Sequence, residues 1–121
     1  MPEQDAVVKQ LATSVVICGA GPVGLTLAHL LALEGIATIV LDKLDSTVAE
    51  PRAIALDGES LRTLQKLGLV DGFTGELLSG LIADYVNGKG EHLFKIGRPG
   101  FRPFGYETIN SFDQPKLDRY L

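Results

Sequence analysis

The sequence predicts an α/β protein built on a parallel β-α-β unit with an added β-hairpin, and three observations support this fold class. A short β-branched segment leads through a glycine-rich turn into a mostly apolar helical segment. A second β-branched segment follows directly, and two parallel strands joined by a helix predict a right-handed crossover. Further along, apolar and polar residues alternate on both sides of an Asn-Gly pair, which is the pattern of a hairpin.

The β-α-β unit is predicted over residues 14–42. Residues 14–18 and 37–42 are rich in β-branched residues, which is typical of fully buried strands. Residues 23–34 between them form the mostly apolar helix. Gly35 ends this helix, because glycine readily takes the left-handed conformation that follows a helix C-terminus.

A polar connection over residues 43–53 leads to a second predicted helix. Asp57 is its expected N-cap and Gly68 its stop. Leucines at helical spacing predict that one face of this helix packs inward. These leucines are Leu61, Leu64 and Leu67.

The elements that follow are shorter. Residues 69–80 fit either a short helix or an irregular loop, and residues 81–96 predict the hairpin. Residues 97–107 are rich in glycine, proline and aromatic residues and predict a structured loop. A short strand over residues 108–112 and a helix over residues 113–121 are expected last.

The composition narrows the classes of function. The 121 residues carry a net charge of -4, which favours neither nucleic acid nor an anionic membrane as a partner. No apolar run reaches membrane-spanning length and the polar N-terminal residues lack a signal-peptide pattern, so we expect a cytoplasmic protein. The single cysteine, Cys18, is expected to be a small buried apolar residue. Because His29 and His92 have no partner at ligand spacing, we expect no metal site, and no catalytic side-chain arrangement is recognised.

Gly19, Gly21 and Gly24 form the G-x-G-x-x-G pattern of a Rossmann-like dinucleotide-binding unit, directly after a strand and before a helix. In this pattern Gly19 permits the tight turn, Gly21 lets a pyrophosphate approach the backbone, and Gly24 lets the helix pack on the strand. The helix N-terminus then attracts the phosphates. Pro22 suits the first helical turn, where its missing N–H costs nothing.

Asp42 ends the second strand, about 20 residues after the glycines, where a carboxylate binds the ribose hydroxyls of adenosine. Its charge would repel a ribose 2′-phosphate, which disfavours NADP in this pocket. NAD and FAD both remain compatible with the glycines and Asp42.

Two further motifs resemble one enzyme family. The segment "EPRAIALDGESLRTLQKLGL" (residues 50–69) is similar to the N-terminal region of the FAD-dependent aromatic hydroxylases, which include p-hydroxybenzoate hydroxylase and phenol hydroxylase. The hairpin "YVNGKG" and the segment "FDQPKLDRYL" also resemble this family. Within it, residues 41–73 are most similar to the 3-(3-hydroxyphenyl)propionate hydroxylases. The resemblance spans residues 14–121 and favours FAD over NAD.

The resemblance implies roles for individual residues. Asp42 would bind the adenosine ribose and Lys43 would lie beside the adenine, although the family more often has Glu where this chain has Asp42. Arg52 would reach the cofactor phosphates, where a guanidinium suits the charge. Gln114 would contact FAD near the pyrophosphate and ribityl chain. The turn around the pyrophosphate would consist of Gly19, Ala20, Gly21, Pro22, Val23 and Gly24.

The resemblance also implies an enzyme. FAD would be the cofactor and NAD(P)H the co-substrate, and oxygen would be used to hydroxylate a phenolic small molecule. Residues 1–13 would be a flexible arm and residues 14–121 the N-terminal part of the FAD-binding domain, with the substrate domain absent. We therefore expect this segment alone to be inactive and to self-associate through uncovered apolar surface of its first two helices.

Two alternatives remain open from the sequence. The chain could be the NAD-binding module of a dehydrogenase, which predicts further alternating strands and helices after Asp42. It could also be a truncated, non-catalytic remnant of the FAD fold, because a glycine turn can persist without its function.

Overall fold

The computed structural model describes residues 10–47 and 49–121. Most of the arm predicted for residues 1–13 therefore lies outside the described residues. At the end of that segment, the Thr13 hydroxyl donates a hydrogen bond of 2.7 Å to the Ala37 carbonyl.

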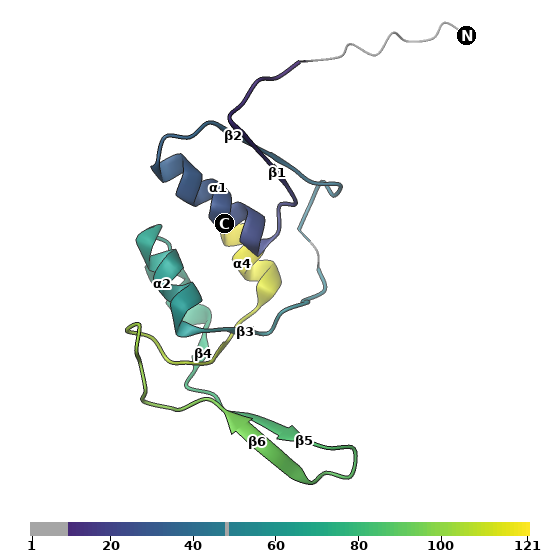
Figure 1. Cartoon of the computed structure of the whole chain (residues 1–121), viewed down its shortest axis with the longest axis vertical. Coiled ribbons are helices and arrows are strands. Elements are labelled where there is room, and N and C mark those ends of the chain that lie inside the picture. The colour runs from purple at the N-terminus through teal and green to yellow at the C-terminus, as the bar shows by residue number, and fades with distance from the viewer. Residues whose placement is uncertain (1–9, 48) are drawn as a thin grey trace, which may run out of the picture.

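The predicted β-α-β unit is confirmed. It consists of β1 (Val15–Cys18), α1 (Pro22–Leu33) and β2 (Thr38–Leu41). The two strands pair in parallel with Val15 opposite Thr38, and α1 lies beside them (Figure 1). Gly35 has a φ of 70° directly after the C-cap of α1, as its position in the sequence predicts.

A second group of elements packs against this unit, mostly below it in Figure 1. It comprises β3 (Ala55–Leu56), α2 (Gly58–Lys66), α3 (Val70–Phe73), the 3-10 turn η1 (Thr74–Glu76), β4 (Leu78–Ser79), β7 (Asn110–Ser111) and α4 (Gln114–Tyr120). The predicted N-cap of α2 is confirmed, because the Asp57 carboxylate accepts a 2.7 Å hydrogen bond from the Ser60 N–H. β7 lies between β3 and β4 and pairs antiparallel with both. The segment that fitted either helix or loop is thus two short helical turns and one edge strand.

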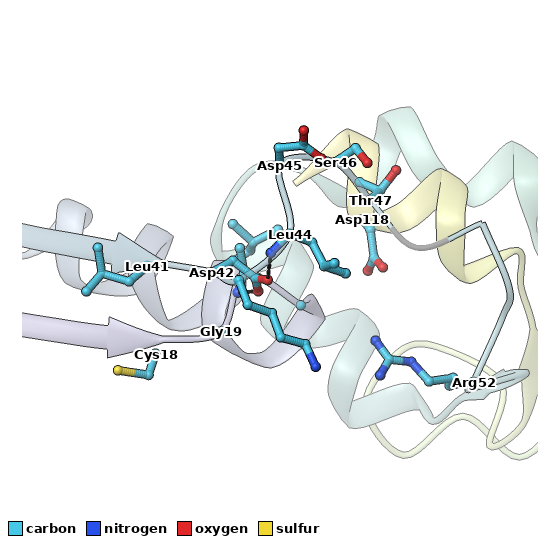
Figure 2. Close-up of a pocket in the computed structure, with 14 residues that line it drawn as sticks. Cys18, Gly19, Leu41, Asp42, Leu44, Asp45, Ser46, Thr47, Arg52 and Asp118 are labelled. Carbon is cyan, nitrogen blue, oxygen red and sulfur yellow. Dashed lines mark hydrogen bonds between the residues drawn. The ribbon is translucent and has the colours of Figure 1, made fainter. Parts of the chain in front are cut away.

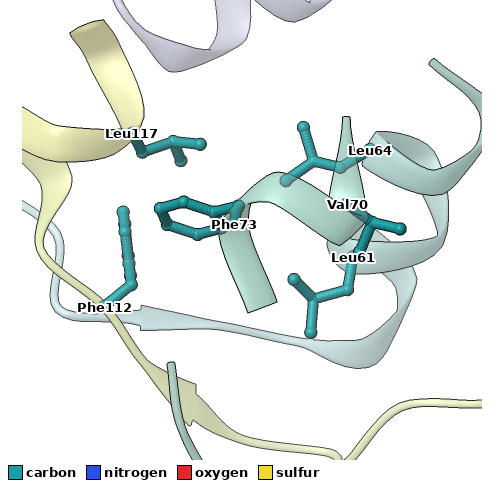
Figure 3. Close-up of a cluster of buried hydrophobic side chains, with 6 residues drawn as sticks. All are labelled: Leu61, Leu64, Val70, Phe73, Phe112 and Leu117. Carbon is teal, nitrogen blue, oxygen red and sulfur yellow. The ribbon is translucent and has the colours of Figure 1, made fainter. Parts of the chain in front are cut away.

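Six buried apolar side chains hold α2, α3 and α4 together (Figure 3). They are Leu61, Leu64, Val70, Phe73, Phe112 and Leu117. The ring of Phe73 meets that of Phe112 edge-on at 6.3 Å between centroids and stacks on Tyr120 at 6.2 Å. Burial of Leu61 and Leu64 confirms the predicted inward face of α2, while Leu67, the C-cap of α2, is half-buried. The burial of Leu61 and Leu64 contradicts the expectation that α2 leaves this apolar surface uncovered. The cluster fixes α4 in place, and α4 carries residues of the site described below.

The predicted hairpin is formed by β5 (Ala83–Val86) and β6 (His92–Ile96) and projects away from the remainder (Figure 1). Its connection covers residues 87–91. The Asn87 side-chain oxygen accepts hydrogen bonds from the N–H groups of Lys89 and Glu91, at 2.9 and 3.0 Å. Gly90 supplies the positive φ of this connection, 82°.

The predicted structured loop over residues 97–107 is confirmed as a non-strand segment. The Glu107 carboxylate organises it, because it accepts hydrogen bonds from the Gly100 N–H at 2.9 Å and from Arg102 Nε at 2.7 Å.

Two expectations about burial in the β-α-β unit are wrong. Among the residues of β1 and β2, only Ile17 is buried, and Cys18 is exposed. Alternate side chains of a strand point to opposite faces. Ile17 faces α1, as its closeness to Gly24 shows, so Val16 and Cys18 point to the other face. Burial of that face would need a second layer, which the described residues do not supply.

The outer side of α1 is also apolar and uncovered. Three of its exposed side chains are Val23, Leu27 and Leu33. Within residues 10–47 and 49–121, no helix is both long enough and apolar enough to cross a membrane.

Candidate nucleotide-binding site

A cavity of about 760 Å³ lies where β1 and β2 end, beside the glycine turn (Figure 2). Ligands in open α/β folds bind outside the carboxyl ends of parallel strands, so its position is the expected one. Its wall is built from the turn after β1, the segment after β2, the loop that carries Arg52, and α4. The lining residues are Cys18, Gly19, Ala20, Gly21, Leu25, Leu41, Asp42, Lys43, Leu44, Asp45, Ser46, Thr47, Arg52 and Asp118.

Glycine occupies each of the three positions of the turn for a different structural reason. Gly19 has a φ of 113°, a left-handed conformation that glycine adopts without strain. A Cβ at Gly24 would overlap the Gly19 carbonyl oxygen, so the close packing of α1 on the turn requires glycine there. A Cβ at Gly21 would meet no atom of the described chain within 4 Å. The fold therefore does not require glycine at position 21, and the open space beside it is available to a ligand.

The Asp42 carboxylate joins the end of β2 to the glycine turn. One of its oxygens accepts a 2.6 Å hydrogen bond from the Ala20 N–H and the other accepts a 2.9 Å hydrogen bond from the Leu44 N–H. The bond from Ala20, followed by that from Leu44, lowers the pKa of Asp42 below its ordinary value. Because a carboxylate has about four acceptor positions, both oxygens can still accept a hydrogen bond from a ribose hydroxyl.

The lowered pKa of Asp42 predicts acid sensitivity of the turn. A carboxyl group whose folded pKa is below its unfolded value stabilises the fold above the unfolded pKa, and this contribution is lost as the pH falls through the folded pKa. We predict that the free energy of unfolding of Asp42→Asn falls less steeply than that of the wild type between about pH 5 and about pH 3. Denaturant unfolding at several pH values measures this, with Asp45→Asn as the control. Parallel curves for Asp42→Asn and wild type would contradict the role assigned to this carboxylate.

Arg52 and Lys43 supply the positive charge of the cavity. Both residues are exposed and line the cavity, and Figure 2 shows the Arg52 guanidinium turned towards it. The backbone of Arg52 is fixed by α4: the side-chain oxygen of Gln114 accepts hydrogen bonds from the N–H groups of Arg52 and Ala53, at 2.7 and 2.8 Å. Two cations beside the N-terminus of α1 suit a phosphate-bearing ligand.

The structure brings most, but not all, of the predicted site residues together. The cavity wall contains Gly19, Ala20, Gly21, Asp42, Lys43 and Arg52, whereas Pro22, Val23, Gly24 and Gln114 are not part of it. Pro22 is the first residue of α1 and Val23 is exposed. Gln114 is buried, with its oxygen turned towards the Arg52 loop.

Asp118 was missed by the sequence analysis. It is buried on α4, yet it lines the cavity together with Arg52. A signal was present, because Asp118 follows Gln114 by four residues and positions i and i+4 share one face of a helix. Among the described residues, no cluster of three or more His, Cys, Asp or Glu side chains could hold a metal ion.

Comparison with known proteins places the chain in a family. Residues 12–121 match the family described as "FAD binding domain". A 3-(3-hydroxy-phenyl)propionate/3-hydroxycinnamic acid hydroxylase of Mycolicibacterium gilvum (strain PYR-GCK) is 42% identical over 113 residues, which are 93% of this chain and 20% of the relative. The hydroxylase of the same name from Paraburkholderia xenovorans (strain LB400) is 40% identical over 92% of this chain and 18% of the relative. The chain thus spans about a fifth of the length of these curated relatives.

Solved structures agree with this assignment. The p-nitrophenol 4-monooxygenase PnpA from Pseudomonas putida DLL-E4 superimposes with a TM-score of 0.70 at 26% identity, over 88% of this chain and 27% of that protein. The flavin-dependent monooxygenase PieE, solved with FAD and substrate, shares the fold with a TM-score of 0.69 at 24% identity, over 93% of this chain and 22% of that protein. The resemblance inferred from the sequence motifs is therefore confirmed, the dehydrogenase alternative is not favoured, and the chain belongs to the FAD-binding domain family.

Proposed function

We propose that the cavity at the ends of β1 and β2 binds the ADP half of FAD, and that the chain is the N-terminal FAD-binding portion of a flavin-dependent monooxygenase. The open space beside Gly21, which no packing within the fold explains, is the observation that carries this proposal. The residues around it fit the ligand, because Arg52 and the N-terminal turn of α1 suit the phosphates and the Asp42 carboxylate stands at the end of β2.

Each group of the wall has a proposed task. Gly19, Ala20 and Gly21 would hold the pyrophosphate, because the two glycines have no side chains and that of Ala20 is a single methyl group. Asp42 accepts hydrogen bonds from the adenosine ribose, and its bond from the Ala20 N–H keeps the carboxylate at the edge of the turn. Lys43 would lie beside the adenine and the Arg52 guanidinium would reach the phosphates, and both residues line the cavity.

The whole protein would hydroxylate a phenolic aromatic compound with NAD(P)H and oxygen, and bound FAD supplies the redox chemistry for this reaction. The names of the relatives support a phenylpropanoid or a similar phenol as the substrate class. In this proposal the residues of the chain hold the cofactor and none of them is a nucleophile or a proton donor. We propose that substrate binding depends on parts of those relatives that this chain does not match, so the chain alone is inactive.

Arg52→Ala tests the phosphate contact. We predict that this substitution lowers FAD affinity by about 1–3 kcal/mol, because it removes a charge-assisted hydrogen bond. The loss should be larger at low salt than at high salt, since screening already weakens the contact in the wild type. Fluorescence titration with FAD at two ionic strengths measures this, and Arg62→Ala, on α2, is the matched control. If Arg52→Ala and the wild type bound FAD equally well at low salt, Arg52 would not contact the phosphates and would be an ordinary surface residue.

The uncovered apolar side chains of α1 support a further proposal about association. We propose that the purified chain self-associates through α1, where Val23, Leu27 and Leu33 are exposed. Sedimentation velocity at several concentrations measures this, and a monomer at all of them would contradict it.

A further inference from the structure

Two buried polar side chains on α4 are linked to each other and to the loop that carries Arg52. Gln114 is 5% exposed and Asp118 is 8% exposed. The Gln114 oxygen accepts from the N–H groups of Arg52 and Ala53, at 2.7 and 2.8 Å. The Gln114 amide NH₂ donates to one oxygen of Asp118 at 3.4 Å, across one turn of the helix.

This network admits only one orientation of the Gln114 amide. Two N–H donors of the loop require the oxygen on their side, so the NH₂ group must face Asp118. An ionised carboxylate only accepts hydrogen bonds, and it therefore selects this orientation of the amide. Asn or Ser at position 118 would present donors as well as acceptors and would select it less strongly.

Asp118 also has a group that the fold does not satisfy. Its second oxygen is buried and has no hydrogen-bond partner in residues 10–47 and 49–121. The side chain lines the same cavity as Arg52, and Figure 2 shows the two charged groups facing that space from α4 and from the loop. Burial raises the pKa of Asp118, while the hydrogen bond from Gln114 and the charge of Arg52 act in the opposite direction. A buried carboxylate without full pairing is costly, and such groups are often found at functional sites.

We infer that Gln114 and Asp118 are a positioning pair: Asp118 orients the Gln114 amide, and Gln114 holds the backbone of Arg52 and Ala53 so that the Arg52 guanidinium faces the cavity. The pair acts through Arg52 and does not itself need to touch a ligand. Its consequence for cofactor affinity rests on the proposed function, whereas the backbone restraint does not.

Amide hydrogen exchange of the full chain without FAD tests the restraint directly. In the wild type, the N–H groups of Arg52 and Ala53 should be protected. In Gln114→Ala both should exchange about tenfold faster or more, because their acceptor is removed. The Ser60 N–H, which is bonded to Asp57, is the internal control and should not change. Unchanged exchange at Arg52 and Ala53, in a variant whose circular dichroism is that of the wild type, would overturn the inference.

Moving the carboxylate from position 118 to position 114 tests the pair. Gln114→Glu alone places two carboxylates in contact, and FAD affinity should fall about tenfold. Adding Asp118→Asn restores the net charge and a hydrogen-bond donor between the two side chains, so the FAD affinity of the double variant should be within about threefold of that of the wild type. In an Arg52→Ala background, neither substitution should change affinity by more than about twofold, since the pair acts through Arg52.

These experiments separate the positioning role of Gln114 and Asp118 from the proposed binding of FAD. Failure of Asp118→Asn to rescue Gln114→Glu, or an undiminished effect in the Arg52→Ala background, would overturn the positioning role. If the wild-type chain did not bind FAD at all, the proposed function would fall, and the exchange rates of Arg52 and Ala53 would still decide the inference.

Discussion

Gly21→Val should abolish measurable FAD binding and leave the fold intact. The Cβ of the added side chain meets no atom of the described chain within 4 Å, and Gly21 has a φ of -82° and an extended ψ that valine adopts readily. The substitution therefore extends into the space that the proposal assigns to the pyrophosphate. We expect FAD affinity to fall at least about 100-fold, which is about 3 kcal/mol, while the thermal midpoint changes little.

Fluorescence titration with FAD, together with thermal unfolding, measures both parts of this prediction. Gly88→Val is the matched control, because Gly88 lies in the connection of the hairpin, away from the cavity, and also has open space beside it. Its FAD affinity should equal that of the wild type. If a folded Gly21→Val protein bound FAD with wild-type affinity, the proposal that the glycine turn contacts the cofactor would be wrong.

Gly24→Ala changes the same motif, but it should lower the stability of the fold instead of blocking the ligand. Its Cβ would overlap the Gly19 carbonyl oxygen and lie 3.3 Å from the Ile17 side chain, so the turn and β1 both pack tightly against the start of α1. We expect the free energy of unfolding to fall by about 3 kcal/mol, since such overpacking forces the backbone to shift. Alanine inside a helix ordinarily stabilises it by about 1 kcal/mol relative to glycine, so the predicted sign is opposite to that of helix propensity.

Denaturant unfolding of Gly24→Ala and of Gly21→Ala separates these two effects. Gly21→Ala has open space and should change stability by less than about 0.5 kcal/mol. A Gly24→Ala protein as stable as the wild type would mean that α1 can move away from the turn without cost.

The features that could be predicted from the sequence are those that a few neighbouring residues determine. The β-α-β unit, the N-cap at Asp57 and the C-terminal glycines of α1 and α2 depend on local backbone preferences, and the structure contains all of them. The short strand predicted over residues 108–112 contains β7, but its pairing with β3 and β4 could not be predicted. Each of these strands has two residues, and the sheet is defined only by pairing between distant segments.

Burial and side-chain partners depended on tertiary context in the same way. The apolar sequence of β1 indicated burial, but Cys18 is exposed because only one face of the two-stranded sheet is covered. The family resemblance pointed to Gln114 but not to its hydrogen bonds with the Arg52 loop. The bond to Arg52 joins residues that are 62 positions apart. The four-residue spacing of Gln114 and Asp118 placed both on one face of a helix, but the burial of the Asp118 carboxylate depends on tertiary packing.

Competition for bound FAD tests the central claim most directly. The wild-type chain is titrated with FAD, and the complex is then challenged with ADP or with FMN at equal concentrations. Because the cavity is proposed to hold the ADP half of the cofactor, ADP should displace FAD and FMN should not. Displacement by FMN without displacement by ADP, or the absence of any FAD binding, would contradict the assignment of this cavity.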